Sequence, residues 1–437
     1  MAKSALPQQY EKENRQLKKE IEDRTGKTTE QLYEEREKRV RDVIELKVPD
    51  RIPLAVNPDT QVFTGIPNSA GYYDPIAFKR SMRTIALDLE PDMANAGIPM
   101  SGEAMTALDV KNRLWPGGPL PPDYDFQAVE GEWMKGDEYD IFLNDPADFV
   151  VRYYWPRLYG AMAPLTKLPP IGNLFQGFEG ITPMLASPEF VKMAKLIAKA
   201  GRATAKFRKT IGDNAEELAQ LGFPALSHLG AGGIGGAPFD TVSSALRGMQ
   251  GSMIDMFRRP EKLLAACDMI LERRIANALP ADPKKRGNPK RTGMPLWRGD
   301  KSFMSQAQFE KFYWPGLKKA MQATIDLGYV AFPYFEAEYG DRLERLLELP
   351  KGKVIASIES VDAVRAKQIL KGHTCLYVRT PLAARVWSFQ ELEAFTKDLI
   401  DKCGKGGGLM LHIRPPNKGT KEEHQKLMNS IREYGRY

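Results

Sequence analysis

Arg298 and Asp300 stand where an apolar run ends, just after "MPLW" and just before an aromatic-rich stretch with helical character. A guanidinium group can hold an anionic ligand through paired N–H donors, and a carboxylate can carry a proton or bind a cation. Polar residues follow several other short apolar runs of the chain in the same way. The pattern predicts a site built where buried strands end.

Glu336 is the strongest of these strand-end residues, because it follows the apolar run "AFPYF" and a carboxylate at that point needs polar partners. We expect catalytic work from Glu336, Asp300 and His228. Substrate binding is expected from a second set of residues: Asn57, Asp59, Asp240, Arg298, Tyr334, Arg379 and His412. Glu338, Glu359, Asp362 and Arg414 also follow such runs.

Structural roles are open alternatives for three of these residues. Asp300 could cap the helix that follows it, since aspartate is a preferred N-cap residue. Arg298 could pair with a neighbouring strand-end carboxylate, and His228 could be a hydrogen-bonded core histidine. The glycine-rich stretch after His228 lacks the Gly-Lys-Ser/Thr ending of a phosphate-binding loop.

Eight β-type runs must position these side chains, and helical patterns separate them. Alternating strands and helices indicate parallel strands joined by right-handed crossovers, and eight such units predict an α/β fold of the (β/α)₈ barrel type. An open doubly wound sheet is the alternative, but no G-x-G-x-x-G follows the first run. The runs span residues 52–56, 92–98, 223–230, 294–299, 329–336, 353–360, 375–380 and 408–414.

The chain divides into a charged helical extension, residues 1–48, and a barrel, residues 49–437. Two segments inside the barrel are expected to be insertions. Residues 99–148 are rich in Pro and Gly, and residues 281–292 form a basic, Pro-containing loop.

Composition excludes several classes of protein. The 437 residues are 42% hydrophobic and 27% charged, and the net charge of +7 is spread among many acids, so we expect no nucleic-acid binding. Three cysteines without C-x-x-C spacing fit a reducing compartment. The N-terminus has no apolar signal region and no run is long enough to cross a membrane. We expect a soluble, cytoplasmic enzyme.

Several segments carry a resemblance to a known family. The region of the third run reads "GAPFDTVSSALRGMQGSMIDMFRRPEKLLAACDMI", the entry into the first reads "EREKRVRDVIELKVPDRIPL", and the last begins at "DLIDKCGKGGGLML". In this order they resemble the uroporphyrinogen decarboxylase superfamily, over roughly residues 34–437. The resemblance implies a TIM barrel with the ligand at the carboxyl ends of the strands.

Two chemistries occur in that superfamily. Its decarboxylases carry an arginine-rich turn after strand one and an aspartate after strand two. Here the first run ends in "LAVNPDTQVF" and the second in "MANAGIPMSGE", and Asp240 stands where the decarboxylases have threonine. An acidic mouth would repel a polycarboxylate. We therefore expect the methyltransferase branch, which moves methyl groups between small molecules and corrinoid (cobalamin) proteins.

The methyltransferase interpretation carries further expectations. No D-x-H-x-x-G motif surrounds any histidine, so the corrinoid would come on a separate partner protein. The thiolate ligands of the thiol-activating members are absent, but zinc also accepts oxygen and nitrogen, so Glu336 and His412 are candidate metal ligands. A second copy of the chain is a further candidate partner. A decarboxylase or lyase for a carboxylated substrate, and a non-catalytic binding protein, are the rival functions.

Overall fold

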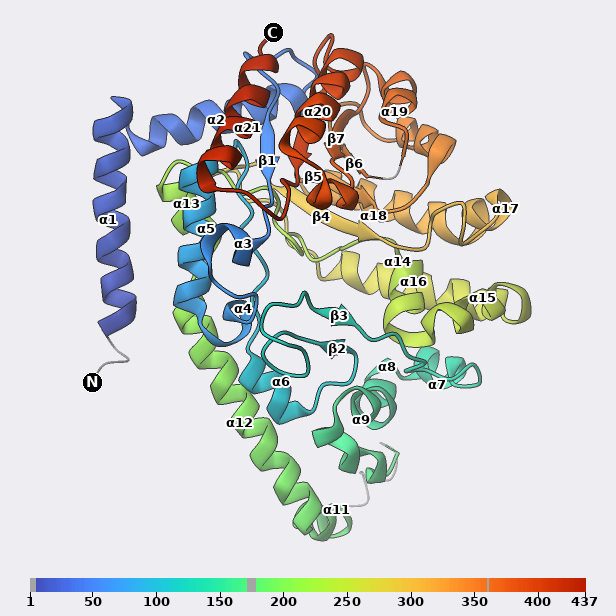
Figure 1. The fold of residues 1–437 in the computed structure, drawn as a ribbon. Helices are drawn as coiled ribbons and strands as arrows, with labels where there is room; N and C mark the ends of the chain where they lie inside the picture. Colours follow the sequence, from blue (N-terminus) through green and yellow to red (C-terminus); the bar gives the residue numbers. More distant parts are fainter. Residues whose placement is uncertain (1–4, 171–177, 360) are drawn as a thin grey trace.

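The computed structural model describes residues 5–170, 178–359 and 361–437. Six parallel strands form one curled sheet in the order β1, β8, β7, β6, β5, β4 (Figure 1). Six of the eight predicted runs are therefore strands. Their bounds are β1 (Leu54–Val56), β4 (Arg291–Leu296), β5 (Val330–Phe335), β6 (Ile355–Ile358), β7 (Cys375–Arg379) and β8 (Leu409–Ile413).

The two other runs, 92–98 and 223–230, are not strands of this sheet. Single parallel bridges join Met93 to Ala55 and Ala94 to Ala225, and the His228 N–H donates to the Arg291 carbonyl over 2.8 Å. The two segments thus lie between β1 and β4. Pro224 has no N–H to give to a ladder, which limits pairing of the second segment. The predicted α/β fold with parallel strands is confirmed, whereas the full eight-stranded barrel is not shown.

Side chains alternate between the two faces of the sheet, as the twofold repeat of a strand requires. One face packs Phe332, Ile355, Tyr377 and Met410 together with Ala55. The other face meets the surrounding helices through Leu54, Leu296, Phe335, Ile358 and Leu411.

The N-terminal helices belong to this architecture. Helix α1 (Ala5–Thr25) projects at the side, whereas α2 (Thr29–Ile44) packs Val40 and Val43 against the first face of the sheet. The Glu37 carboxylate on α2 pairs with the buried Arg291 guanidinium of β4 over 2.7 Å. Residues 29–44 are thus part of the core rather than a detached extension. The predicted boundary at residue 48 stays a prediction.

Longer helices cover the outer face of the sheet. Capping boxes at Ser388 and Thr420 begin the two that follow β7 and β8. The covering helices are α5 (Pro75–Leu89), α13 (Asn214–Gln220), α16 (Pro260–Ala276), α18 (Trp314–Asp326), α19 (Ala363–Leu370), α20 (Phe389–Cys403) and α21 (Lys421–Tyr434).

A lobe lies below the sheet in Figure 1, on the side where β1 runs into α3 (Thr60–Thr64) and α4 (Ala70–Tyr73). It contains the predicted insertion 99–148 and extends to residue 211. Its elements are α6 (Gly102–Leu108), β2 (Arg113–Leu114), β3 (Gln127–Ala128), α7 (Tyr139–Asn144), α8 (Pro146–Phe149), α9 (Trp155–Leu158), α11 (Phe178–Leu185) and α12 (Pro188–Ile211).

The remaining helices of the described chain are α14 (Pro238–Thr241), α15 (Gly248–Arg258) and α17 (Gln306–Gln308). Tighter or wider helical turns occur at η2 (Val150–Tyr154), η3 (Gly160–Lys167), η4 (Val242–Arg247), η5 (Phe309–Tyr313), η6 (Gly340–Glu348) and η7 (Leu382–Val386).

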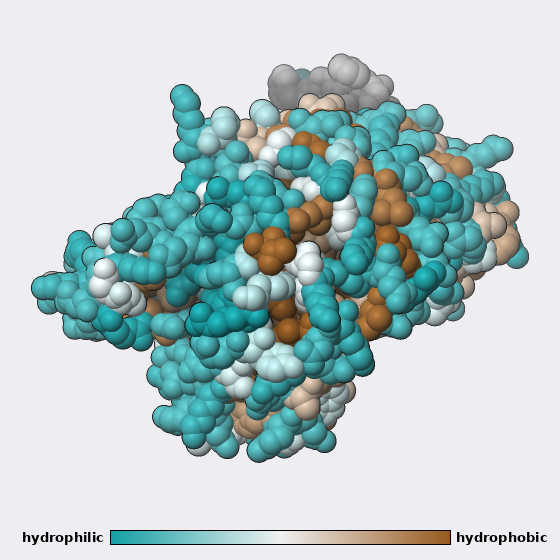
Figure 2. Space-filling model, turned by 90° about the horizontal axis from the view of Figure 1, so that it is seen from above, coloured by the Kyte–Doolittle hydropathy of each residue, from teal (hydrophilic) through white to brown (hydrophobic). Residues whose placement is uncertain are grey.

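The face seen in Figure 2 is mostly hydrophilic, and its hydrophobic side chains form separate small patches. Within the described ranges no helix combines the length and the apolar character that crossing a bilayer requires.

Candidate functional site

Polar side chains gather on one face of the sheet where β5 to β8 end. Register pairs Tyr334 with Ser357, Ser357 with Tyr377, and Arg379 with His412, so these side chains share the face that packs against α2 lower down. With the residues just beyond the strands they form a group that we call the mouth cluster: Tyr334, Glu336, Ser357, Glu359, Arg379, His412 and Arg414.

Arg379 is at the centre of the mouth cluster. Its Nε donates to Ser357 Oγ over 3.0 Å, and its Nη1 lies 3.1 Å from His412 Nδ1. The guanidinium also lies over the Tyr334 ring, with its carbon 4.0 Å from the ring centroid. None of the ion pairs found among the described residues includes Arg379. Its charge is therefore held by neutral groups, and an anionic ligand would meet it without displacing a carboxylate.

His412 is held as a neutral imidazole. An arginine can only donate, so His412 Nδ1 must accept the hydrogen bond from Arg379. Burial, together with the charges of Arg379, Arg414 and Arg385, places the pKa of His412 well below its usual value. The neutral imidazole thus lies among three arginine side chains without adding a positive charge of its own.

Glu359 and Arg414 form a buried pair beside it. Arg414 Nη1 lies 2.8 Å from Glu359 Oε1, its Nη2 donates to Oε2 over 2.9 Å, and the Tyr334 hydroxyl donates to the same Oε2. Burial opposes ionisation of Glu359, but the bonds from Arg414 and Tyr334 outweigh it and lower the pKa of the carboxyl. This pair fixes the orientation of Tyr334 and thus of the ring beneath Arg379.

Glu336 directly follows β5 and remains accessible to solvent. Partial burial raises the pKa of its carboxyl, and the nearby Glu359 raises it further, against the opposing charges of Arg379 and Arg414. A carboxyl with a raised pKa keeps its proton to higher pH and can serve as a general acid. The mouth cluster thus places a carboxyl of raised pKa near a guanidinium of a kind that can bind an anion.

The structure brings together four residues predicted from the sequence: Tyr334, Glu336, Arg379 and His412. Asn57 lies at the end of β1, where its backbone N–H donates to Ile413 O over 2.9 Å. Asp59 caps α3 through the Val62 N–H and lies 3.5 Å from Arg385, whose charge acts on His412.

Asp300 is placed differently from our expectation. Its Oδ1 accepts from the Ser302 N–H over 2.8 Å and from the Phe303 N–H over 3.2 Å, and it also accepts from the Ser302 hydroxyl. The carboxylate therefore caps the turn after β4. This is the capping role that the sequence left open for Asp300, and its expected catalytic role stays a prediction.

Arg298 and Asp240 meet each other but not the mouth cluster. Asp240 accepts from the Trp297 and Arg298 N–H groups over 3.1 and 3.0 Å, and from the Tyr313 hydroxyl over 2.7 Å. Burial raises the pKa of Asp240 to about 7, against these donors. The Arg298 guanidinium reaches Glu130 over 2.8 Å. These contacts anchor the end of β4, and the expected substrate contacts of both residues stay predictions.

His228 lies in a cavity of about 550 Å³ between the segments 94–99, 211–215 and 226–229. Its Nδ1 is buried and has no hydrogen-bond partner within the described ranges. Burial, with the charges of Lys290 and Arg291, lowers the pKa of His228 to about 4, so the ring is neutral. The expected catalytic role of His228 stays a prediction.

The donors present do not fit a zinc site. Over residues 5–170, 178–359 and 361–437, no group of three His, Cys, Asp or Glu side chains is arranged to hold a metal ion. His412 Nδ1 faces the Arg379 guanidinium, and all three cysteines are buried and unpaired. Among the described residues, Glu336 and His412 are thus not accompanied by a third His, Cys, Asp or Glu arranged to complete a zinc site.

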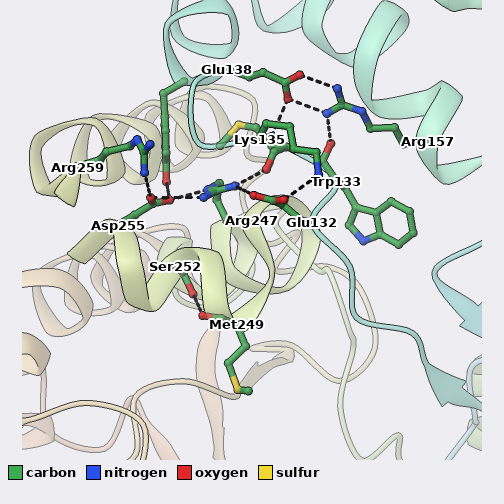
Figure 3. Close-up of polar contacts among 12 residues, drawn as sticks. Glu132, Trp133, Lys135, Glu138, Arg157, Arg247, Met249, Ser252, Asp255 and Arg259 are labelled. Atoms are coloured by element: carbon green, nitrogen blue, oxygen red, sulfur yellow. Dashed lines mark hydrogen bonds and ion pairs between the residues drawn. The ribbon is translucent and has the colours of Figure 1, made fainter. Parts of the chain in front are cut away.

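A second polar assembly surrounds α15 and is drawn in Figure 3. We call it the Arg247 network. The buried Arg247 guanidinium donates to Asp255 over 2.5 Å and pairs with Glu132, while Arg259 and the Tyr139 hydroxyl reach Asp255 over 3.0 and 2.9 Å. A cavity of about 430 Å³ lies beside it. Each charged group here has a charged partner, which indicates a structural role.

Four residues of the mouth cluster or its surroundings were not among the predicted site residues: Ser357, Glu359, Arg414 and Arg385. Glu359 and Arg414 follow β-type runs, so their position was visible in the sequence. Their pairing was not, because 55 residues separate them.

Comparisons with known proteins bear on the fold. No protein-family model matches the sequence, and no curated protein matches it. Among solved structures, the chain is similar to a methyltransferase from Methanosarcina mazei, with a TM-score of 0.51 and 14% sequence identity. The similarity covers 91% of this chain and 98% of that one. At this identity the likeness shows a common fold over nearly the whole of both chains.

Proposed function

We propose that this protein is a methyltransferase that moves a methyl group between a small molecule and a corrinoid carried by a separate protein. The observation that carries the proposal is the mouth cluster, where Glu336 with its raised pKa lies near an Arg379 that has no carboxylate partner among the described residues. The fold shared with a methyltransferase supports it. We further propose membership of the uroporphyrinogen decarboxylase superfamily and a cytoplasmic location, which the three unpaired cysteines support.

The chemistry assigned to this chain is binding, orientation and proton transfer. Arg379 would bind an anionic group of the substrate, with the Tyr334 ring and the Glu359–Arg414 pair keeping the guanidinium in place. The corrinoid supplies the nucleophile when its protein is docked. As the methyl–heteroatom bond breaks, its electron pair stays on the heteroatom, which takes the proton of Glu336. No step runs through zinc, because the donor set does not fit it.

Replacing Glu336 by glutamine tests this assignment. The amide keeps the shape but cannot donate a carboxyl proton, so methyl transfer should fall on the order of 10²–10⁴-fold. The readout is the absorbance change of reduced cobalamin, free or protein-bound, incubated with methylated amines, ethers, phenols and thiols. Glu338→Gln is the matched control, since Glu338 is an exposed acid two residues further on. Unchanged turnover of Glu336→Gln would refute the role of Glu336.

A decarboxylase is the second candidate function, and the arginines near His412 favour it. We expected an acidic mouth, but Asp59 and Asp240 are engaged, and Arg379, Arg385 and Arg414 all lie close enough to His412 to affect its pKa or contact it. Such a group suits a carboxylated substrate. Incubation with uroporphyrinogen should yield no coproporphyrinogen if the methyltransferase proposal holds. Efficient conversion would overturn it in favour of the decarboxylase.

A further inference from the structure

Helix α12, residues Pro188–Ile211, carries a continuous row of positive charge on its outer side. The row contains residues spaced three and four apart, which places them on one side of the helix. Its members are Lys192, Lys195, Lys199, Arg202, Lys206 and Lys209, and all six are exposed. The row spans about 26 Å at 1.5 Å per residue. The 23 residues from 190 to 212 contain no acid.

The charges of this row are not used inside the molecule. Elsewhere the exposed bases commonly pair, as Lys262 does with Asp140 and Lys318 with Glu348. No ion pair found in the described part of the chain includes a member of the row. Glu189, the acid nearest to its start, is paired with Lys167 over 2.6 Å. Like charges repeated along one helix side repel one another, so the row lowers the stability of the helix. No ion pair within the described residues offsets this repulsion.

The opposite side of α12 is already occupied. Phe190, Met193 and Ala200 are buried, and the helix packs against α6, η3 and α5. Figure 1 shows α12 along the outer edge of the lobe, and all six bases of the row are exposed. Next to the row, Ala194, Ala198 and Ala205 are exposed, and a Cβ on Gly201 would meet nothing within 4 Å. Small side chains at these positions would let another backbone approach closely.

These features select among anionic partners. A membrane-surface helix inserts its apolar side into the lipid, but Phe190 and Met193 of α12 are buried, and Val191 and Ile197 are its exposed large apolar side chains. Binding of single-stranded nucleic acid uses exposed aromatic rings, and of the two aromatics of α12, Phe190 is buried and Phe207 is half-buried. A straight row of bases beside small residues instead matches an acidic helix laid along α12, with carboxylates at the same spacing of three and four.

We propose that α12 is a docking surface for a partner protein that presents an acidic helix. The contact consists of Lys/Arg–carboxylate pairs along the row, with the partner's backbone close to Ala194, Ala198 and Gly201. The surface is distinct from the mouth cluster, and the proposal is independent of the reaction that the protein catalyses.

A designed peptide tests the surface on the full-length protein. The probe is an alanine-based helical peptide with glutamates spaced three and four apart on one side, and its twin carries glutamine at those positions. Fluorescence anisotropy at about 50 mM salt, where surface charges are weakly screened, should detect the glutamate peptide and not its twin. Lys195→Glu, Lys199→Glu and Arg202→Glu together should weaken binding at least about tenfold, a loss of about 1.4 kcal/mol.

The matched control reverses Lys12, Arg15 and Lys19 on α1. These are also exposed and similarly spaced, and they change the net charge equally, but they lie among acids. Circular dichroism checks that both triple variants are folded. An equal loss of peptide binding in both triple variants would show that the effect depends on net charge alone, and would overturn the proposal. So would tighter binding of duplex or single-stranded DNA, or of phosphatidylserine vesicles, than of the glutamate peptide.

Discussion

The mouth cluster and the Arg247 network contain the same kinds of side chain, yet their charges are balanced differently. In the Arg247 network, Arg247 meets Asp255 and Glu132, and Arg259 meets Asp255 as well. In the mouth cluster, Arg379 meets a hydroxyl and a neutral imidazole. A charge bound by an opposite charge holds the fold together, whereas a charge held by neutral groups is available to a ligand. Removing each charge in turn distinguishes the two cases.

The largest effect on stability is expected from Arg247→Met. Asp255 is fully buried, and without Arg247 its charge loses its closest partner, which should lower the free energy of unfolding by about 3–5 kcal/mol. Urea unfolding followed by circular dichroism measures this loss. The double variant Arg247→Met, Asp255→Leu should recover much of it, because no charge then stays buried. A single variant as stable as the wild type would show that the network is not structural.

Asp240, which anchors the end of β4, should make stability depend on pH. Its pKa is raised to about 7 in the folded protein, above the ordinary value near 4, so the folded state holds a proton that the unfolded state has released. This contribution is present at pH 4 and is lost as the pH rises to 7, by roughly 2–4 kcal/mol at 1.36 kcal/mol per pH unit. Asp240→Asn should flatten the profile of unfolding free energy between pH 4 and 7. An unchanged slope would refute the assignment.

Arg379→Met should lower activity and change stability little, whereas Arg247→Met should mainly lower stability. No ion pair found in the described part of the chain includes Arg379, so its removal should change the free energy of unfolding little. Loss of a charge-assisted hydrogen bond to the substrate costs about 1.5–3 kcal/mol, or on the order of 10- to 100-fold in kcat/KM. Removing the neighbouring charge should also raise the pKa of His412, observed by NMR titration. A strongly destabilised Arg379→Met with an unshifted His412 would remove the contrast between the two regions.

The smallest effect is expected from Arg298→Gln. Its ion pair with Glu130 is partly exposed, with 19% and 41% of the two side chains accessible, and such pairs contribute at most about 1 kcal/mol. Thermal unfolding should therefore shift little, and kcat/KM should equal that of the wild type. A loss of activity as large as that of Arg379→Met would return Arg298 to the site.

Local pattern was sufficient for much of the fold. The alternation of apolar runs and helical stretches predicted the six strands of the sheet. The strand-end rule also placed Tyr334, Glu336, Arg379 and His412 on one edge, because parallel strands that end together bring their following residues together. The division at residue 48 and the corrinoid partner stay predictions.

Tertiary structure alone decided which strand-end arginine forms an ion pair with a carboxylate. From the sequence, Arg298 and Arg379 are equivalent, since each ends a β-type run. In the folded chain a glutamate 168 residues away reaches Arg298. Asp300 caps the turn after β4, and the hydrogen bonds of Arg379 among the described residues go to Ser357 and His412. Spacing along the chain determines which face a side chain occupies. Its partner, and thus its charge state, depends on segments brought together by the packing of the whole core.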